Sequence, residues 1–393
     1  MDTVYKRLLI YPFVIIITAV FAHLWATQPL FWKKIPYRIQ AYKLAFSEVY
    51  CDSGTPARLA DLLKYHALPN FALTGEVVYV DSSGKNYSCR VAPDGEKGNQ
   101  FRLASMTKAI TAHAVIRLAE EGRLGLGATL LSFFPEVDTK SLRDPRLAQV
   151  TISQLLNHSS GFGGPFGSDD MVKRGRSPWC PRDFRQLETV RLAGTPGTNY
   201  VYSNVSYCLL GEIVARAVGE PYRQYVEKRY LVESSVAFVD GEYLPDEPRY
   251  DFSNDFRFGR DYVNWLDFRA LSSAAGLIGR PDDFARIIWE RLHPDPNYLL
   301  NGPLVPGCGK DEISECYSWN FELEFDNQGD ILAGVQQGYV PGVSSLLAIT
   351  PAGQVLVWIA AGAPVEGRNK EQLQQAVVKF LAHESGKKTR GGG

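Results

Sequence analysis

Ser105 and Lys108 stand three residues apart at the start of a helical pattern, in the stretch FRLASMTKAITAHAVIRLAEEGRL. Residues i and i+3 share one face of a helix, so the lysine amine can reach the serine hydroxyl. A serine hydroxyl is a poor nucleophile at its ordinary pKa and needs an adjacent base. A lysine can be that base only if burial or a neighbouring cation lowers its pKa from about 10.4. The pair therefore predicts an acyl-transfer nucleophile at the positive end of a helix, which favours a developing alkoxide.

The Ser-x-x-Lys pattern is weak by itself, because the chain repeats it at Ser82/Lys85 and Ser385/Lys388. The first repeat lies in a predicted hairpin turn and the second in the polar C-terminal tail, so neither opens an apolar helix. An N-cap serine followed by a solvated lysine is the simpler interpretation of such a motif. The long helical pattern that follows is what singles out Ser105.

A second candidate group is the tripeptide Tyr202-Ser203-Asn204, just ahead of the helical pattern VSYCLLGEIVARAV. A phenol beside a lysine cation has a pKa below its usual value of about 10 and can relay protons. The Asn204 amide could hold the lysine or a substrate amide. The tripeptide is also weak alone, since Tyr262-Val263-Asn264 has the same form and a tyrosine near a helix start is often simple packing.

The elements that must position these residues are strands at both ends of the chain with helices between them. A hairpin is predicted in GEVVYVDSSGKNYSCRVA, and three strand-like runs near the C-terminus are YSWNFELEF, SSLLAITP and QVLVWIAAG. The helical patterns include VTISQLLNHSSG, capped by Thr151 or Ser153, then the run after Asn204, one begun by Pro281, and the closing NKEQLQQAVVKFLAHE. This order predicts an α/β layer that holds an inserted all-helical region.

Five segments in this order resemble the serine β-lactamase-like superfamily, in the branch of class C β-lactamases, DD-peptidases and related esterases. The segments are FRLASMTKAITA, VTISQLLNHSSG, PGTNYVYSNVSYCLLGEIVARAVG, LSSAAGLIGRPDDFARII and VPGVSSLLAITPAG. The resemblance covers roughly residues 70–385. It implies a β-lactamase/transpeptidase-like fold of α/β plus all-α class: an antiparallel sheet flanked by helices, an inserted helical domain, and an active site in the cleft between them.

The resemblance also implies roles for matching positions. Ser105 would form the acyl-enzyme, Lys108 would be its proton partner, and Tyr202 would be the base and acid shared with Lys108. Asn204 would orient Lys108 and the substrate amide. The backbone N–H groups of Ser105 and Tyr339 would form an oxyanion hole, which is often worth about 10²–10³ in rate. No clear extra carboxylate base is present, in keeping with the class C-like pattern.

The chain departs from the family on the strand before VPGVSS, where a lysine or histidine is common. Counting back gives Gln336-Gln337-Gly338. Gly338 still allows close backbone approach to a ligand, but the cation that would hold a substrate carboxylate is replaced by a neutral amide. Gln336, Gly338 and Tyr339 are therefore expected to bind substrate. We expect weak or no β-lactamase and carboxypeptidase activity, and better turnover of uncharged esters or amides.

A small-molecule or peptide substrate is the partner that the resemblance implies. The net charge of −1 gives no reason to expect nucleic acid. The six histidines and six cysteines show no metal-ligand spacing, so we expect neither metal nor cofactor. His158, in NHSSG, could serve as a general base, but the resemblance implies that it is scaffold.

The N-terminal run Leu8–Ala26 is apolar and uncharged, and has the length of a membrane-spanning helix. Lys6 and Arg7 precede it and aromatic residues follow it, so we expect a single-pass membrane anchor with the catalytic domain on the non-cytosolic side. A cleaved signal peptide and a buried helix are the alternatives. The basic residues beyond the run argue for the opposite orientation, although long domains translocate largely regardless of charge.

Domain boundaries follow from these assignments: a tail at 1–7, the anchor at 8–26, a membrane-proximal segment at 27–60, the hydrolase domain at 61–385 and a disordered tail at 386–393. The helical insertion is expected at about 125–270. Disulfides are possible outside the cytosol, with Cys308 and Cys316 close enough for a local bridge, although buried thiols would look the same in sequence.

Two hypotheses for function remain at this point. The first is a membrane-anchored serine hydrolase that works through an acyl-enzyme on esters, amides or small peptides. The second is a penicillin-binding-like sensor or scaffold that keeps the fold without efficient catalysis. The intact set of Ser105, Lys108, Tyr202 and Asn204 favours the first, and the missing cation near Gln336 favours the second.

Overall fold

The computed structural model describes most of the 393-residue chain. The described residues are 2–27, 39, 41–44, 46, 48–70, 72–91, 100–163, 171, 177–248, 266–292, 295, 297–305, 316–340, 342–362 and 368–387. For residues 2–10, 292, 368 and 369 the description is limited to the helical backbone.

The centre of the molecule is an eight-stranded antiparallel sheet with the strand order β1-β3-β2-β11-β10-β9-β8-β7. Its strands are β1 Tyr50–Cys51, β2 Thr74–Val80, β3 Asn86–Val91, β7 Tyr317–Ser318, β8 Phe321–Phe325, β9 Ile331–Val340, β10 Val343–Ile349 and β11 Val355–Ala361. Both β10 and β11 are buried at every position, because helices cover both faces of the sheet. Such strands read as continuous apolar runs rather than as alternating patterns.

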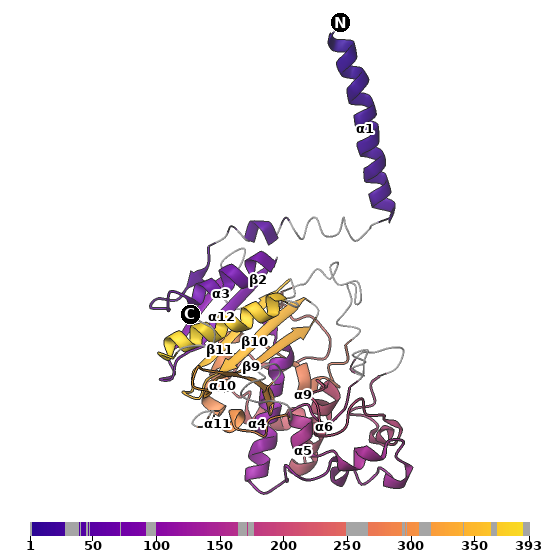
Figure 1. Ribbon diagram of the computed structural model, residues 1–393, viewed down its shortest axis with the longest axis vertical. Helices are drawn as coiled ribbons and strands as arrows, with labels where there is room; N and C mark the ends of the chain where they lie inside the picture. Colours follow the sequence, from indigo (N-terminus) through magenta and orange to yellow (C-terminus); the bar gives the residue numbers. More distant parts are fainter. Residues whose placement is uncertain are drawn as a thin grey trace.

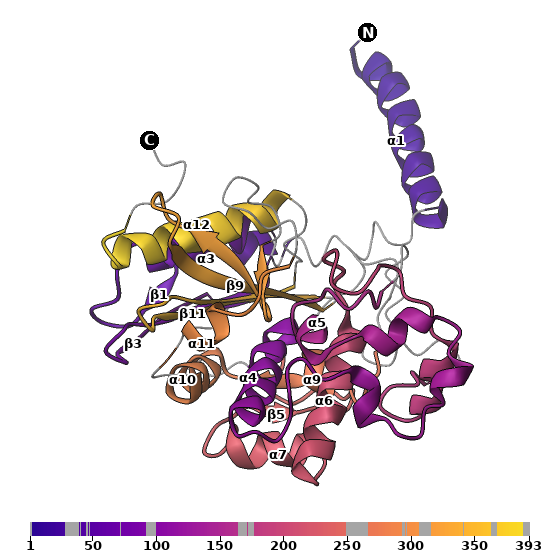
Figure 2. The ribbon, with the colours of Figure 1, turned by 60° about the horizontal axis from the view of Figure 1, so that its bottom comes forward.

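Two hydrophobic clusters lie on opposite faces of this sheet. The smaller one joins the sheet to α3, Leu59–His66, and α12, Arg368–Glu384, which lie side by side over the same face (Figure 1). The indole of Trp358 on β11 lies in this cluster and donates to the carbonyl of Leu62, at 3.1 Å. The larger cluster joins the opposite face to α10, Pro281–Leu292, and to the helices around α4, Thr107–Glu120 (Figure 2).

The helical part of the molecule surrounds α4, Thr107–Glu120, whose side chains are buried on almost every face. A helix apolar all round belongs at the centre of a bundle. Against it pack α6 Asn204–Val218 and α9 Ser272–Ala275. Helices α5 Ile152–Leu156 and α7 Tyr222–Arg229 pack against α6, and α11 Asn297–Leu300 contacts α4 through the rings of Tyr298 and His113. The 3₁₀ helices are η1 Leu68–Asn70, η2 Ala104–Met106, η3 Leu130–Phe133, η4 Thr139–Ser141, η5 Pro145–Gln149 and η6 Phe184–Thr189. A second sheet has the order β4-β6-β5, with β4 Phe101–Arg102, β6 Leu277–Gly279 and β5 Ala237–Phe238.

Local signals in the sequence explain several element ends. The Thr151 hydroxyl and the Gln154 side chain form a reciprocal capping box at the start of α5. Ser203 caps α6 by accepting from the backbone N–H of Ser206, and α6 ends at Gly219 in the left-handed conformation. The predicted hairpin is confirmed as β2 and β3, and the predicted start at Pro281 is the first residue of α10.

One strand assignment was wrong. The run YSWNFELEF does not form one strand, because the chain turns at Trp319 and Asn320 and pairs β7 with β8 as a tight hairpin. Trp319 has a left-handed φ of 42°, which continuous extended backbone does not allow. The alternation of apolar residues continues across the turn, so the sequence pattern hides it.

The membrane-anchor prediction is corrected by the N-terminal helix, α1 Asp2–Thr27. In the part of the chain that the structure describes, no helix combines the length and apolar character needed to cross a membrane. The predicted single-pass anchor at Leu8–Ala26 and the membrane location that depended on it are therefore withdrawn.

Disulfides are present, as the sequence allowed. Cys51 on β1 is bonded to Cys89 on β3, and Cys180 is bonded to Cys208 on α6. Cys316 is also disulfide-bonded, while Cys308, its suggested local partner, lies outside the described residues. The second bridge ties the segment that precedes η6 to the helix whose first residue is Asn204.

Candidate active site

Ser105 lies in η2, in the short connection between β4 and α4. The preceding residue, Ala104, has a left-handed φ of 50°, which turns the chain sharply from the strand into the helix. A left-handed conformation is uncommon for a residue with a side chain and often marks a functional site. Only 7% of Ser105 is exposed, so the hydroxyl is enclosed by protein.

Lys108 is fully buried one turn further along, and its ammonium group has an acceptor for each of its three hydrogens. Its Nζ donates to Ser105 Oγ at 3.0 Å, to Asn204 Oδ1 at 2.6 Å and to the carbonyl oxygen of Ala274 at 2.9 Å. An ammonium group offers three donors and no acceptor. A buried amine held in this way has one orientation, with one of its hydrogens directed at the Ser105 oxygen.

Tyr202 completes the group from the other side of Ser105. Its hydroxyl lies 2.5 Å from Ser105 Oγ, a distance at which either oxygen can donate. The Lys108 Nζ lies 5.0 Å from the centre of the Tyr202 ring. Tyr202 is 40% exposed, in contrast to the buried lysine. Tyr202 is therefore the most exposed member of the group that surrounds the Ser105 oxygen.

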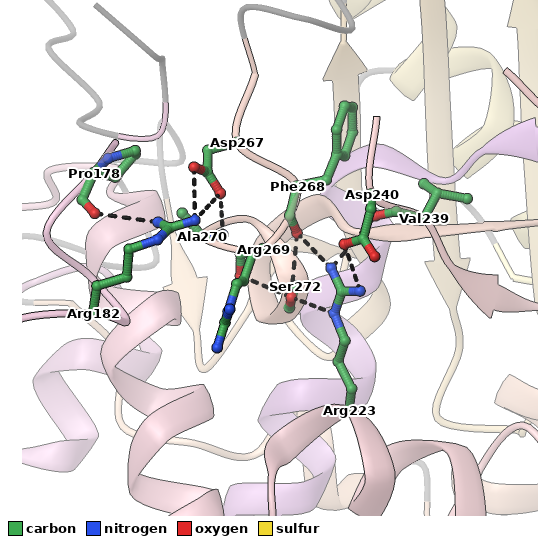
Figure 3. A network of polar contacts seen from close by, with 10 residues as sticks. All are labelled: Pro178, Arg182, Arg223, Val239, Asp240, Asp267, Phe268, Arg269, Ala270 and Ser272. Atoms are coloured by element: carbon green, nitrogen blue, oxygen red, sulfur yellow. Dashed lines mark hydrogen bonds and ion pairs between the residues drawn. The ribbon is translucent and has the colours of Figure 1, made fainter. Parts of the chain in front are cut away.

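The position of the Ala274 carbonyl, which accepts from Lys108, depends on how the segment before α9 is held. Figure 3 shows the contacts that hold this segment. Arg182 contacts both carboxylate oxygens of Asp267, at 3.0 and 2.9 Å. Arg223 of α7 donates to Ser272 Oγ at 2.8 Å and forms an ion pair with Asp240 at 2.8 Å. Two arginines thus anchor the backbone that leads into α9, which fixes the carbonyl that Lys108 uses.

Strand β9 lies beside η2 and forms the opposing wall of the site. A Cβ atom added to Gly338 would lie 2.9 Å from the backbone nitrogen of Ser105 and 3.1 Å from the Cβ of Ala104. Only glycine therefore lets β9 approach the Ser105 backbone this closely. Tyr339 follows, opposite Ser344 of β10. The oxyanion hole formed by the backbone N–H groups of Ser105 and Tyr339 remains a prediction.

Gln336 and Gln337 point to opposite faces of β9, as alternate residues in a strand do. The Gln337 side chain is hydrogen-bonded to Gln374 of α12, which in turn donates to Glu324 at 2.7 Å. Gln336 lies on the same face as Gly338 and is 97% buried, since 3% of it is exposed. The neutral amide of Gln336 therefore occupies the position where the resemblance leads one to expect a cation.

His158, for which the resemblance implies a scaffold role, contacts the candidate site. Its ring lies 4.6 Å from the Tyr202 ring, and its Nδ1 accepts from the backbone N–H of Ser203 at 3.2 Å. Burial, and then the nearby Lys108 charge, hold the pKa of His158 well below its usual value. A neutral imidazole packed under the phenol supports the position of Tyr202 and is not placed to take the Ser105 proton.

The other Ser-x-x-Lys motifs and the second Tyr-x-Asn tripeptide show no comparable group of contacts in the described structure. Ser82 and Lys85 lie in the turn between β2 and β3, with no hydrogen bond between them in the described structure. Lys388 and the Tyr262-Val263-Asn264 tripeptide lie outside the described residues. Among the described side chains, no group of three or more histidine, cysteine, aspartate or glutamate residues could hold a metal ion.

One participant could not be found by searching for side-chain motifs, and the contact made by a second, His158, was not predicted. The Ala274 carbonyl is a backbone group, and it is 166 positions from Lys108 in sequence. The contact between His158 and Tyr202 depends on how α5 and the start of α6 pack. The position of His158 in NHSSG, just after a predicted helix, was the single available signal.

Known proteins resemble this chain over most of its length. Residues 75–312 match the sequence profile described as "Beta-lactamase". A putative fimbrial assembly protein FimD, serogroup D, of Dichelobacter nodosus is 27% identical over 94% of this chain and 95% of its own length. Esterase EstB of Burkholderia gladioli is 33% identical over 63% of this chain and 73% of its own length.

A solved structure supports the fold. The D-amino acid amidase of Ochrobactrum anthropi SV3, complexed with L-phenylalanine amide, superposes with a TM-score of 0.63. The match covers 83% of this chain and 98% of the amidase chain, at 18% sequence identity. The predicted fold, an antiparallel sheet flanked by helices with an inserted helical region, is confirmed by the topology and by this similarity.

Proposed function

Because the chain belongs to the beta-lactamase family and is a serine hydrolase, we propose that Ser105 attacks its substrate to form an acyl-enzyme. The observation that carries the proposal is the hydrogen-bonded group around the Ser105 oxygen, with Tyr202 at 2.5 Å and Lys108 at 3.0 Å. A nucleophile within hydrogen-bond reach of its base, with that base oriented by a third group, is the usual arrangement for covalent catalysis.

The proton of Ser105 passes to the Tyr202 oxygen, which the adjacent Lys108 cation stabilises as a phenolate. The Ser105 oxygen then adds to the substrate carbonyl, and the negative charge on the carbonyl oxygen is held by backbone N–H groups. One of these is the N–H of Ser105, whose nitrogen lies beside Gly338 of β9. Collapse of the tetrahedral intermediate breaks the bond to the leaving group, which takes the proton from Tyr202. Water, deprotonated by the same phenolate, then hydrolyses the acyl-enzyme and restores Ser105.

Neutral esters and amides are the substrates that this site suits. Gln336 offers no positive charge on the strand that faces Ser105, so a substrate carboxylate gains no ion pair there. Similarity to an esterase over 63% of the chain is in keeping with this assignment. The same absence of charge argues against efficient turnover of penicillins.

Steady-state kinetics test the proposal on two substrates, phenyl acetate and benzylpenicillin, with the full chain and its Ser105→Ala variant. We expect measurable hydrolysis of phenyl acetate, weak or no hydrolysis of the penicillin, and loss of both activities in the variant. A strong preference for the penicillin would overturn the substrate assignment. Equal ester turnover by the parent and the variant would overturn the role of Ser105.

A non-catalytic role in assembly or sensing is the second candidate. One observation favours it: the relative described as a putative fimbrial assembly protein matches 94% of this chain, a larger share than the esterase does. The complete set of contacts around Ser105 argues against it, because a scaffold has no need of a lysine with three buried acceptors beside a serine. Absence of any ester or amide turnover would favour this candidate.

A further inference from the structure

The contact of the Gln336 amide with the Gln337 carbonyl determines which terminal atom is the nitrogen and which is the oxygen. One of its two terminal atoms lies 2.6 Å from the carbonyl oxygen of Gln337. A carbonyl oxygen accepts and never donates, so the atom that contacts it must be the NH₂ group. The other terminal atom of Gln336 is therefore the oxygen, Oε1.

That oxygen is buried and lacks a hydrogen-bond donor within the described structure. Most buried polar groups in proteins are paired, so each exception needs an explanation. The Gln336 side chain does not point to solvent, where water could donate to its oxygen, since 3% of the residue is exposed. The side chain of Gln337, the amide next in sequence, lies on the other face of the sheet, where it donates to Gln374 of α12.

The location of this unpaired acceptor connects it with the Ser105 group. Gln336 and Gly338 occupy the same face of β9, and Gly338 is the residue that touches the Ser105 backbone. Two residues of a strand extend about 7 Å. An acceptor is thus held on the wall opposite Ser105, within the length of a small substrate from the carbonyl under attack.

We propose that Gln336 Oε1 accepts a hydrogen bond from an N–H group of the substrate, so that the site selects amide- or amine-bearing substrates over carboxylate-bearing ones. The inference rests on the proposed hydrolase function and makes its substrate class narrower. An N–H donor satisfies the buried oxygen, whereas a carboxylate brings a second acceptor against it. A site built to pair a substrate N–H rejects an analogue without it more strongly than an apolar pocket would.

Two matched pairs of esters test the proposal, one for each side of the scissile bond. Phenyl N-acetylglycinate and phenyl 4-oxopentanoate differ in the acyl part by NH against CH₂. 2-Acetoxyacetamide and acetoxyacetone differ in the leaving group by NH₂ against CH₃. We expect the N–H member of at least one pair to have a kcat/KM about tenfold higher or more with the full chain. Phenyl hemisuccinate, the carboxylate analogue of the first pair, is expected to be the poorest acyl substrate.

The Gln336→Met variant keeps the length of the side chain and removes the acceptor, so it should bring the ratio within the preferred pair close to one. Gln337→Met is the matched control: it makes the same chemical change on the opposite face and should leave the ratio as it is. Ratios near one for both pairs with the parent protein overturn the inference without any variant, as does a preference that survives in Gln336→Met.

Phenyl acetate, which carries no N–H group, separates this inference from the proposed function. Turnover of phenyl acetate without any N–H preference rejects the role of Gln336 and keeps the hydrolase. No turnover of any ester rejects the hydrolase, and the role of Gln336 falls with it.

Discussion

The two walls around Ser105 differ in how completely their polar groups are paired. On the helical wall, formed by Ser105, Lys108, Tyr202 and Asn204, every donor of the buried ammonium group already has an acceptor. On the strand wall, formed by Gln336, Gly338 and Tyr339, the buried Gln336 oxygen has no donor in the described structure.

The difference indicates that the helical wall serves the reaction and the strand wall serves substrate recognition. Reactive groups gain from being fixed before the substrate arrives, because pre-organised polar groups need no reorganisation during the reaction. A recognition group is instead completed by its ligand. Changes to the helical wall should therefore affect kcat for every substrate, and changes to the strand wall should alter which substrate is preferred.

The largest expected effect comes from removing a proton-transfer group on the helical wall. Lys108→Met and Tyr202→Phe should each lower kcat by about 10²–10⁴ on both neutral and N–H-bearing esters, because acid–base groups typically contribute that much. Steady-state kinetics on phenyl acetate and phenyl N-acetylglycinate measure it. Since the two residues act as a unit, the double variant should be little worse than the worse single variant. Additive losses in the double variant would show that Lys108 and Tyr202 act independently.

A smaller effect concerns Glu76 in the central sheet and the pH dependence of the free energy of unfolding. Burial, and then Asp282, raise the pKa of Glu76 on β2 to about 7. The folded protein therefore holds a proton on Glu76 that the unfolded chain loses at about 4.5, so this stabilising contribution is complete below pH 4.5 and is lost as the pH rises through 7. Glu76→Gln should remove a decline of up to about 3 kcal/mol in the free energy of unfolding between those values. Urea unfolding at pH 4.5 and pH 8 measures it, and an unchanged decline in the variant would contradict the assignment.

His113, in the helical part of the molecule, should make stability depend on pH in the opposite direction. Burial lowers the pKa of His113 on α4 to about 3, where its ring contacts the Tyr230 hydroxyl at 2.7 Å. The unfolded chain takes up a proton at about 6.5 and the folded protein does not, so stability is complete above pH 6.5 and is lost as the pH falls toward 3. At pH 5 the loss should be about 2 kcal/mol. Thermal unfolding at pH 7 and pH 5 should show a smaller shift for His113→Gln than for the parent; equal shifts would be inconsistent with a buried neutral His113.

The sequence was sufficient to bring together the helical wall. Ser105 and Lys108 share a helix face by their spacing, and the order of segments connects them with Tyr202 and Asn204 although the two pairs are far apart in the chain. The structure places all four within one hydrogen-bonded group. Side-chain spacing on regular elements is a short-range property, and sequence patterns report it well.

What the sequence could not give depends on long-range packing. The third acceptor of Lys108 is the backbone carbonyl of Ala274, which no residue type marks. The turn at Trp319 is hidden by an apolar alternation that continues across it. The departure at Gln336 was visible as the loss of a cation, but the direction of its amide depends on the Gln337 carbonyl and becomes visible only in three dimensions.

Covalent labelling is the decisive test of whether Ser105 is an activated nucleophile. The full chain and its Ser105→Ala variant are treated with a fluorophosphonate and their intact masses are compared. We expect one adduct on the parent and none on the variant, because the variant lacks the hydroxyl that we propose as the nucleophile. No adduct on either protein, or an equal adduct on both, would contradict it.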